Sequence, residues 1–468
     1  MFEYDKRAKT SGAIWLPVVW MLICGSRPLS LWLGMGGSLE ENLEGNPLDR
    51  VVFSLMVLIG ILVLVARGRR VVPIIVANWP LLLFVSYCAV SVVWSDFPGV
   101  AFKRWVKALG DPLMVLIVLT DPDRSAAVKR FFAWTGFVFV PVSILFAKYY
   151  PLLGLRFYRD GSRAMVGVAT DKNMLGAICL VTGLVVVWRL VYAARQRPRQ
   201  IPYRSLVAHV VVLGMVVWLL HNANSMTSIA CLTFGSILLV ATSFPLVVKS
   251  RIVIHMLVLM ALSAACIPLF LDAAGGVLNA VGRDPTLTQR TELWGEVIKL
   301  TPNSLLGAGF ESFWLGRRLD ILWAHFWWKP NESHNGYLEV FLNLGWIGIS
   351  LLALVLLSGY RNALAMLRWD PWGGGLKLAC LVAGVMYGLT EAGFRMMHPV
   401  WVATMFAAVA TPPTSNEISL QPKPVTSREW KRAVAVRGVS PSFRVPRRPT
   451  REPSSLAGSR TNRWSPRQ

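Results

Sequence analysis

Long apolar runs recur along almost the whole chain and constrain its fold more than any other feature. A helix needs roughly 20 mostly apolar residues to cross a bilayer. With 54% hydrophobic and only 16% charged residues among 468, the chain is unlike a soluble or an intrinsically disordered protein. We predict an all-α polytopic membrane protein with about twelve transmembrane helices. The candidate spans begin near Ala13, Val51, Ile74, Trp105, Phe131, Asn173, Leu206, Thr227, Val253, Tyr337, Leu376 and Trp401.

Basic loops indicate which ends of these spans face the cytoplasm. They fall on one side, together with the N-terminus, only if the weak fourth span is counted, although Lys107 and Asp111 interrupt it. By the positive-inside rule this side is cytoplasmic, so both termini are predicted to lie inside. The loops in question contain Arg67, Arg69 and Arg70; Arg195, Arg197, Arg199 and Arg204; Lys249 and Arg251; and Arg361 and Arg368.

These spans divide the chain into three predicted parts. A short cytoplasmic N-terminus (1–12) precedes a transmembrane domain (13–411), and a tail rich in Pro, Ser and Arg (412–468) follows. The tail has no apolar periodicity, so we predict that it is disordered and faces lipid. The net charge of +23 is then explained by the anionic inner leaflet and requires no nucleic-acid partner. The six cysteines lie in apolar stretches without a CxxC pair, which indicates packing residues.

The longest outer segment (272–335) is too polar to span the membrane and too long for a simple connector. It is nearly neutral and rich in tryptophan, so we expect a folded, functional periplasmic loop. Asp284-Pro285 predicts a helix start, and Arg290 then lies on the same face as the apolar Trp294 and Val297. Arg290 is either a snorkelling side chain that reaches lipid headgroups or a ligand for phosphate or carboxylate in a pocket.

A second feature, Ser333-His334-Asn335, precedes the tenth predicted span. Ser333 predicts an N-cap, which places His334 in the first helical turn. There the helix dipole disfavours imidazolium, so we expect a neutral His334 that can accept a proton. The alternative is an interfacial histidine with an ordinary hydrogen bond.

Polar residues also gather before the sixth span. Arg163, Lys172 and Asn173 are either interface anchors or a second set of phosphate contacts. Asp121-Pro122-Asp123 has the DxD form of metal-dependent sugar transferases, but its position before the fifth span favours a helix cap. We find no metal-binding motif and no nucleotide-binding loop, and therefore expect no cofactor. His398 and Arg395 lie in the last outer loop and could join a site, although their spacing indicates no particular role.

Several motifs, in order, resemble the O-antigen ligase and exopolysaccharide polymerase family (the Wzy, WaaL and ExoQ types). Together they cover roughly residues 20–410, and the long outer loop occurs at the expected place. The start of the chain resembles the exopolysaccharide branch in particular. The matching segments are Ser26-Arg27-Pro28-Leu29-Ser30-Leu31-Trp32; Gly167 with Asp171-Lys172-Asn173; Gln289-Arg290, Trp294, Pro302 and Gly307-Ala308-Gly309-Phe310; and Ser333-His334-Asn335 with Leu344-Gly345 and Gly348.

The resemblance implies a metal-independent glycosyltransferase of GT-C-like architecture in the inner membrane of a bacterium. Its donor would be an undecaprenyl-diphosphate-linked glycan. His334 would be the base for the acceptor hydroxyl, and Arg290 would stabilise the leaving diphosphate. A hydrophobic groove between spans would hold the polyprenyl tail. The further substrate-binding candidates are Arg163, Lys172, Asn173, Arg317, Arg318 and Asn335.

Alternatives differ in the acceptor or in the class of function. The first is a polymerase of repeat units, and the second is a ligase that transfers finished chains to lipid A–core. A transporter or flippase would place more ionisable residues at mid-membrane, and a non-catalytic assembly subunit remains a further alternative. Export or chain-length proteins are the implied partners. Ser225 is followed by Met226, which departs from the family, because the family often has Arg or Lys after this serine.

Overall fold

The structure is a computed structural model that describes residues 10–35, 45–157, 163–195, 203–273 and 286–412. The chain divides into two compact units, Met1–Pro412 and Pro413–Gln468, and the second lies outside the described residues. The predicted basic tail and the helix start at Asp284-Pro285 also lie outside them, apart from residue 412.

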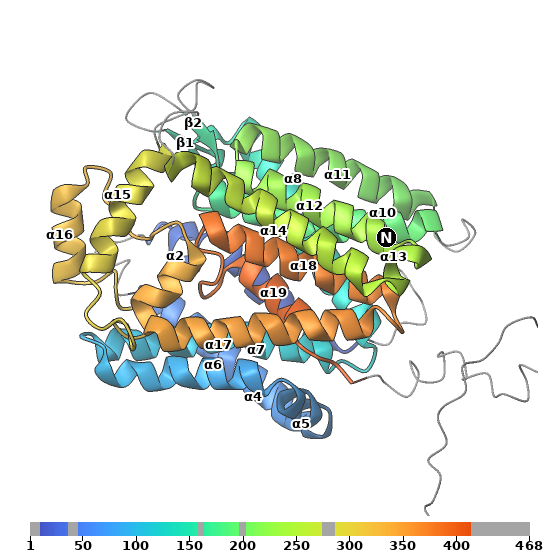
Figure 1. Cartoon of the computed structure of the whole chain (residues 1–468), viewed down its shortest axis with the longest axis horizontal. Coiled ribbons are helices and arrows are strands. Elements are labelled where there is room, and N and C mark those ends of the chain that lie inside the picture. Colours follow the sequence, from blue (N-terminus) through green and yellow to red (C-terminus); the bar gives the residue numbers. More distant parts are fainter. Residues whose placement is uncertain (1–9, 36–44, 158–162, 196–202, 274–285, 413–468) are drawn as a thin grey trace, which may run out of the picture. The chain divides into compact units, whose positions relative to one another are not determined.

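The described part of the first unit is almost entirely helical, as predicted (Figure 1). One short antiparallel hairpin pairs β1 with β2, with Arg156 opposite Ala164. In chain order the elements are η1 (Gly12–Ile14), α1 (Trp15–Cys24), α2 (Leu29–Trp32), α4 (Pro47–Ala66), α5 (Gly68–Ala77), α6 (Trp79–Val90), η2 (Ser91–Trp94), α7 (Pro98–Leu119), α8 (Arg124–Tyr149), α9 (Pro151–Gly154), β1 (Leu155–Phe157), β2 (Arg163–Met165), α10 (Lys172–Arg195), α11 (Tyr203–Ala223), α12 (Met226–Thr242), α13 (Pro245–Lys249), α14 (Arg251–Ala273), α15 (Thr286–Lys299), α16 (Arg317–His325), α17 (Gly336–Met366), α18 (Pro371–Thr390) and α19 (Pro399–Ala408).

Within the described residues, 6 helices are long and apolar enough to cross a membrane, or up to 7 if a bent pair counts as one span. They are α4, α8, α10, α11, α17 and α18. Shorter apolar helices (Gly12–Cys24, Met226–Thr242, Arg251–Cys266 and Pro399–Ala408) account for four more of the predicted spans. The fourth predicted span corresponds to α7, which also carries Lys103 and Arg104. Eleven predicted spans thus each fall on one helix, while the count of twelve crossings stays a prediction.

The third span differs from the prediction. We expected one helix from Ile74, but α5 and the helix from Trp79 to Trp94 meet at 88°. The bend occurs at Asn78, whose Nδ2 donates to the carbonyl oxygens of Ile74 at 2.7 Å and Ala410 at 2.9 Å. The amide nitrogen of Ala410 donates back to Asn78 Oδ1 at 2.6 Å. The continuous apolar part therefore begins at Trp79.

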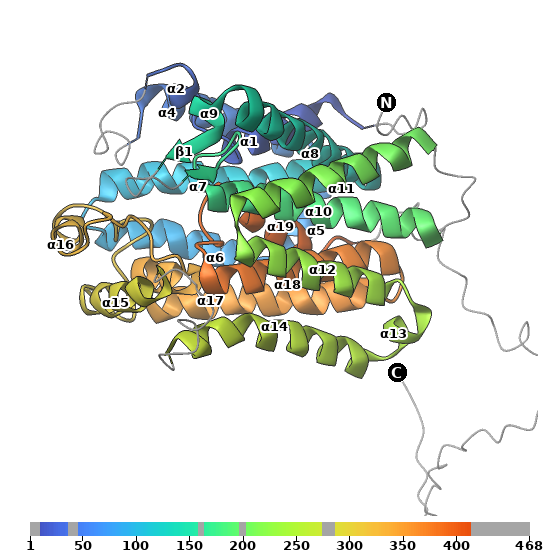
Figure 2. The ribbon, with the colours of Figure 1, turned by 90° about the horizontal axis from the view of Figure 1, so that it is seen from above.

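The two ends of the helix bundle are built differently (Figures 1 and 2). The hairpin, α2, α15 and α16 lie at one end, and α13 lies at the other. Asp123 caps α8, since its Oδ1 accepts a hydrogen bond from the amide of Ala126 at 3.0 Å. Asp121 lies 3.6 Å from the guanidinium of Arg67 in an ion pair. The cap interpretation of Asp121-Pro122-Asp123 is therefore confirmed.

Helices α18 and α19, which are among the most enclosed, flank the connection 391–398. In α10 and α18, 72% of the apolar 18-residue stretch of the helix is buried inside the protein, against 28% in α4. Every residue of α19 is buried. Because α18 and α19 follow each other in the chain, their connection (391–398) lies among the core helices.

A break in α17 ties the segment 304–308 to this helix. Gly345 has a φ of 64°, which non-glycine residues rarely adopt, and a Cβ there would lie 2.2 Å from the carbonyl oxygen of Leu305. The backbone groups freed at the break pair with the loop before Gly309. Trp346 N donates to Ser304 O at 2.9 Å, and Ala308 N donates to Leu342 O at 2.9 Å.

We expect Gly345→Ala to destabilise the protein strongly, because the new methyl group meets backbone and the residue must keep a left-handed conformation. The combined cost should be about 2–4 kcal/mol. Thermal unfolding in detergent measures it. Gly214→Ala is the matched control, since no atom lies within 4 Å of a Cβ at that helical position. An unchanged melting temperature for Gly345→Ala would contradict the described break.

Candidate functional site

Glu391 lies at the centre of the site. It follows directly after α18, and only 9% of its side chain is exposed. Asn173 Nδ2 donates to its Oε2 at 2.9 Å, and Arg290 Nη2 lies 3.6 Å from its Oε1. His334 Nδ1 lies 3.4 Å from Oε2. Three of the predicted site residues, from α10, α15 and the loop before α17, therefore meet around one carboxylate.

We did not single out Glu391 from the sequence, although a signal was present. It is the only acidic residue between Asp370 and Glu417, and it directly follows the apolar residues of α18. An ionisable residue at the end of a candidate membrane span is a functional-site hypothesis by default. Its partners, however, are far away in the sequence, so the cluster emerges only from the fold.

His334 differs from the prediction in position and in charge. The N-cap of α17 is Asn335, whose Oδ1 accepts hydrogen bonds from Tyr337 N at 3.0 Å and Leu338 N at 3.1 Å. Ser333 is not the cap, because its hydroxyl donates to the carbonyl oxygen of Asn335 at 3.1 Å. His334 therefore lies before the helix, with a φ of 53°.

Two carboxylates surround the imidazole of His334. Its Nδ1 lies 2.9 Å from Glu332 Oε1 and 3.4 Å from Glu391 Oε2. Burial alone lowers the pKa of His334, but the hydrogen bonds and negative charges of both glutamates outweigh it and raise the pKa to about 10. The prediction of a neutral imidazole in the resting protein is thus wrong. A helix dipole contributes less than two carboxylates in direct contact.

Arg290 points into the protein and not toward lipid headgroups. Its Nη1 donates to the carbonyl oxygen of Thr390 at 2.9 Å, and its side chain is 21% exposed. About one turn later on α15, Trp294 Nε1 donates to the carbonyl oxygen of Ser333 at 2.8 Å. Helix α15 is therefore fastened both to the end of α18 and to the loop that carries His334.

Arg395 extends the cluster on the other side of His334. Its Nη1 donates to Glu332 Oε2 at 3.1 Å, and its Nε lies 3.5 Å from Glu311 Oε2. The carbonyl oxygen of Glu311 accepts a hydrogen bond from Arg104. Cations and carboxylates thus alternate from Arg104 to Arg290.

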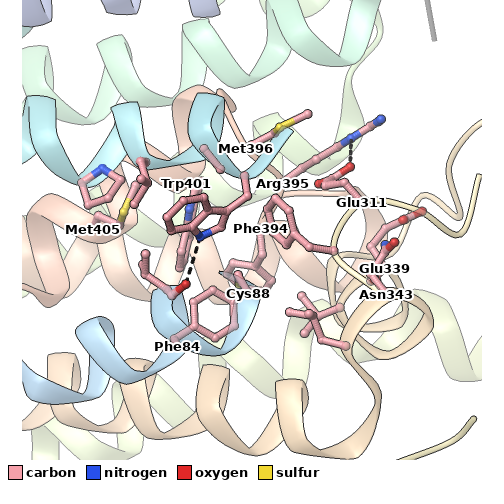
Figure 3. Close-up of a pocket in the computed structure, with 18 residues that line it drawn as sticks. Phe84, Cys88, Glu311, Glu339, Asn343, Phe394, Arg395, Met396, Trp401 and Met405 are labelled. Carbon is pink, nitrogen blue, oxygen red and sulfur yellow. Dashed lines mark hydrogen bonds and ion pairs between the residues drawn. The ribbon is translucent and has the colours of Figure 1, made fainter. Parts of the chain in front are cut away.

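A cavity of about 50 Å³ opens beside this charged chain (Figure 3). Its walls are mainly apolar and come from α6, α7, α17 and the start of α19. Glu311, Glu339 and Arg395 supply its charged groups. Glu339 is held by Trp314, whose Nε1 donates to its Oε2 at 2.9 Å. The other lining residues include Phe84, Cys88, Trp105, Phe394, Trp401 and Met405.

The remaining predicted site residues are placed less centrally. Lys172 begins α10 next to Asn173, half-buried and without an ion-pair partner among the described residues. Arg163 is exposed at the start of β2, and Arg317 is exposed at the start of α16. Arg318 forms an ion pair with Asp96 at 2.6 Å. Among the described residues, none of these cations contacts Glu391.

The cluster also contains groups that could coordinate a metal ion. One ligand atom each from Glu332, His334 and Glu391 lies within 4.8 Å of the others. Arg395 and Arg290 already contact the two carboxylates, and their positive charges oppose a divalent cation. We had expected no metal, and this stays a prediction that a chelator tests.

No protein-family model matches the chain. A search of known proteins finds a relative involved in polysaccharide production. The chain is similar to ExoQ. This exopolysaccharide production protein of Rhizobium meliloti (strain 1021) is 24% identical over 299 residues, which are 61% of this chain. The match covers 65% of the length of ExoQ. It supports the resemblance that the motifs indicated.

We expect Arg290 and Glu391 to be coupled in stability. Glu391→Gln leaves a largely buried guanidinium without its carboxylate, and Arg290→Gln leaves the carboxylate without its guanidinium. Each single variant should therefore lower the free energy of unfolding by about 1–3 kcal/mol, and the double variant by less than the sum of the two losses. Thermal unfolding of the four proteins measures the coupling energy. The exposed pair Glu296 and Lys299 on the same helix, 2.8 Å apart, is the control and should show no measurable coupling. Additive losses at Arg290 and Glu391 would contradict the described ion pair.

Proposed function

We propose that the protein is a membrane glycosyltransferase that polymerises undecaprenyl-diphosphate-linked oligosaccharide repeat units at the periplasmic face. The main support is the convergence of Arg290, His334 and Asn173 on Glu391. The similarity to an exopolysaccharide production protein supports the substrate class. The position of the cluster, at the bundle end that carries α15 and α16, suits a substrate outside the cytoplasm (Figure 1).

The proposed reaction is a displacement at the anomeric carbon of the donor. The acceptor hydroxyl oxygen forms a bond to this carbon, and the bond from the carbon to the diphosphate oxygen breaks. The bonding electrons leave with undecaprenyl diphosphate, and the hydroxyl proton passes to His334 once its imidazole is neutral. Arg290 and the other cations stabilise the departing diphosphate. The reaction needs no nucleotide and no metal ion.

The cavity beside the cluster suits the lipid end of such a donor. Phe84 and Met405 line its apolar side and Arg395 lines its charged side (Figure 3). Its volume of about 50 Å³ suits only the junction between the diphosphate and the first atoms of the isoprenoid chain. Lys172 extends the cationic surface next to Asn173. The exposed Arg317 and Arg163 provide outer contacts for the glycan, whereas Arg318 and Asn335 hold the protein's own loops through the contacts described above.

We expect purified protein in lipid to lengthen a polyprenyl-diphosphate oligosaccharide. His334→Ala and Arg290→Ala should each lower turnover at least 100-fold, because they remove the base and a cation for the leaving group. Product length on a gel measures turnover. His325→Ala, an exposed histidine of α16, is the matched control and should keep wild-type turnover.

Four outcomes of this assay bear on the proposal and its alternatives. Transfer to lipid A–core without chain lengthening identifies a ligase. Wild-type turnover in both variants contradicts the roles assigned to His334 and Arg290. Movement of the donor across the bilayer without transfer favours a flippase. Loss of turnover in a chelator, restored by a divalent cation, overturns the metal-free mechanism.

The pH profile tests the role of His334 as a base. Its pKa of about 10 keeps the imidazole protonated at neutral pH. Because the neutral form is required, kcat/KM should rise with pH toward that value. Glu391→Gln removes a negative charge and lowers the pKa of His334, so the rise should move to lower pH. A profile that keeps its midpoint in Glu391→Gln would contradict this assignment.

The proposed orientation can be tested separately in intact cells. A thiol reagent that does not cross membranes should label Asp320→Cys on α16 but not Arg69→Cys at the start of α5. Five of the six native cysteines are buried and one is partly buried, so labelling of the unsubstituted chain gives the background signal. The opposite labelling pattern would invert the topology.

A further inference from the structure

We propose that Arg395 binds the diphosphate of the lipid donor, and that Glu311 and Glu332 occupy its guanidinium until the donor arrives. This inference rests on the proposed function. It adds a binding residue to which the motifs assigned no role.

The first argument is position. Arg395 lies in the connection between the core helices α18 and α19 and lines the apolar cavity (Figure 3). It also contacts Glu332, which is close to His334 in the sequence. A lipid diphosphate joins an apolar chain to a sugar at a doubly phosphorylated link. Its charged group must therefore lie where the apolar cavity meets the reacting groups. Among the described residues, Arg395 is the only Lys or Arg that lines this cavity.

The second argument is the hydrogen-bonding capacity of the guanidinium. An arginine offers five N–H donors. The contacts of Arg395 use Nε and Nη1, while Nη2 makes no hydrogen bond with a described residue. Its side chain is 33% exposed. Arg290, in contrast, uses both Nη atoms on Thr390 and Glu391 and does not line the cavity.

The third argument is that Arg395 can exchange one anion for another at low electrostatic cost. Glu332 and Glu311 present carboxylate oxygens where phosphate oxygens would bind. If Arg395 turns to a diphosphate, Glu332 keeps His334 as a partner at 2.9 Å. Glu311 keeps Arg104, whose positive charge acts on it and which holds its carbonyl oxygen. Neither carboxylate is left as an isolated buried charge, which would be strongly unfavourable.

Binding of undecaprenyl diphosphate, which carries no sugar, tests this inference without requiring turnover. In full-length protein in detergent, Arg395→Gln should weaken binding about 10- to 100-fold, as expected for a lost charge-assisted hydrogen bond. Arg395→Lys keeps the charge and should lose less. Glu311→Gln removes a competing carboxylate and should tighten binding severalfold, which a purely structural ion pair would not do.

Controls separate this inference from the proposed function. Arg67→Gln removes another arginine that forms an ion pair and should bind as the wild type does. Wild-type protein that fails to bind undecaprenyl diphosphate overturns both proposals. Normal binding in Arg395→Gln, or unchanged binding in Glu311→Gln, overturns the role of Arg395 and leaves the proposed function standing. If Arg395→Gln does not fold, Arg395→Lys and Glu311→Gln decide alone.

Discussion

The charge of Glu391 organises the end of the bundle that carries α15 and α16. A carboxylate with 9% exposure is stable only if cations and N–H donors surround it. Here they come from Asn173 on α10, Arg290 on α15 and His334 before α17. Each of these segments is far from Glu391 in the sequence, so satisfying one carboxylate brings α15 together with the ends of α10, α17 and α18. Structural and chemical roles therefore rest on the same contacts.

Sequence reasoning found the residues that stand out locally and missed those defined by distant partners. Arg290, His334 and Asn173 are polar side chains next to apolar runs, a pattern that one segment reveals alone. The charge of His334 was mispredicted because the helix dipole was considered without the carboxylates of Glu332, two residues away, and Glu391, 57 residues away. The bend at Asn78 likewise depends on Ala410, 332 residues later. Long-range hydrogen bonds of this kind leave no periodicity in the sequence.

The alternation of charge around the site bears on how a charged donor can be accommodated. Arg104, Arg395, His334 and Arg290 alternate with Glu311, Glu332 and Glu391, so positive and negative groups nearly balance. Such a site avoids a surplus of positive charge while it is empty of substrate. In the proposed mechanism an anion binds by exchange of partners, which links donor binding to the freedom of the carboxylates next to His334.

The break in α17 also limits where this chain can vary in length. The backbone of residues 304–308 completes the hydrogen bonding of a helix interrupted at Gly345. An inserted or deleted residue in that short stretch would leave amide and carbonyl groups of a membrane helix without partners, a cost of several kcal/mol each in lipid. The chain at the exposed side of α16, around Arg317 and Asp320, can change in length without this cost. Relatives that accept different glycans should therefore differ in length around α16 and keep the 304–308 segment constant.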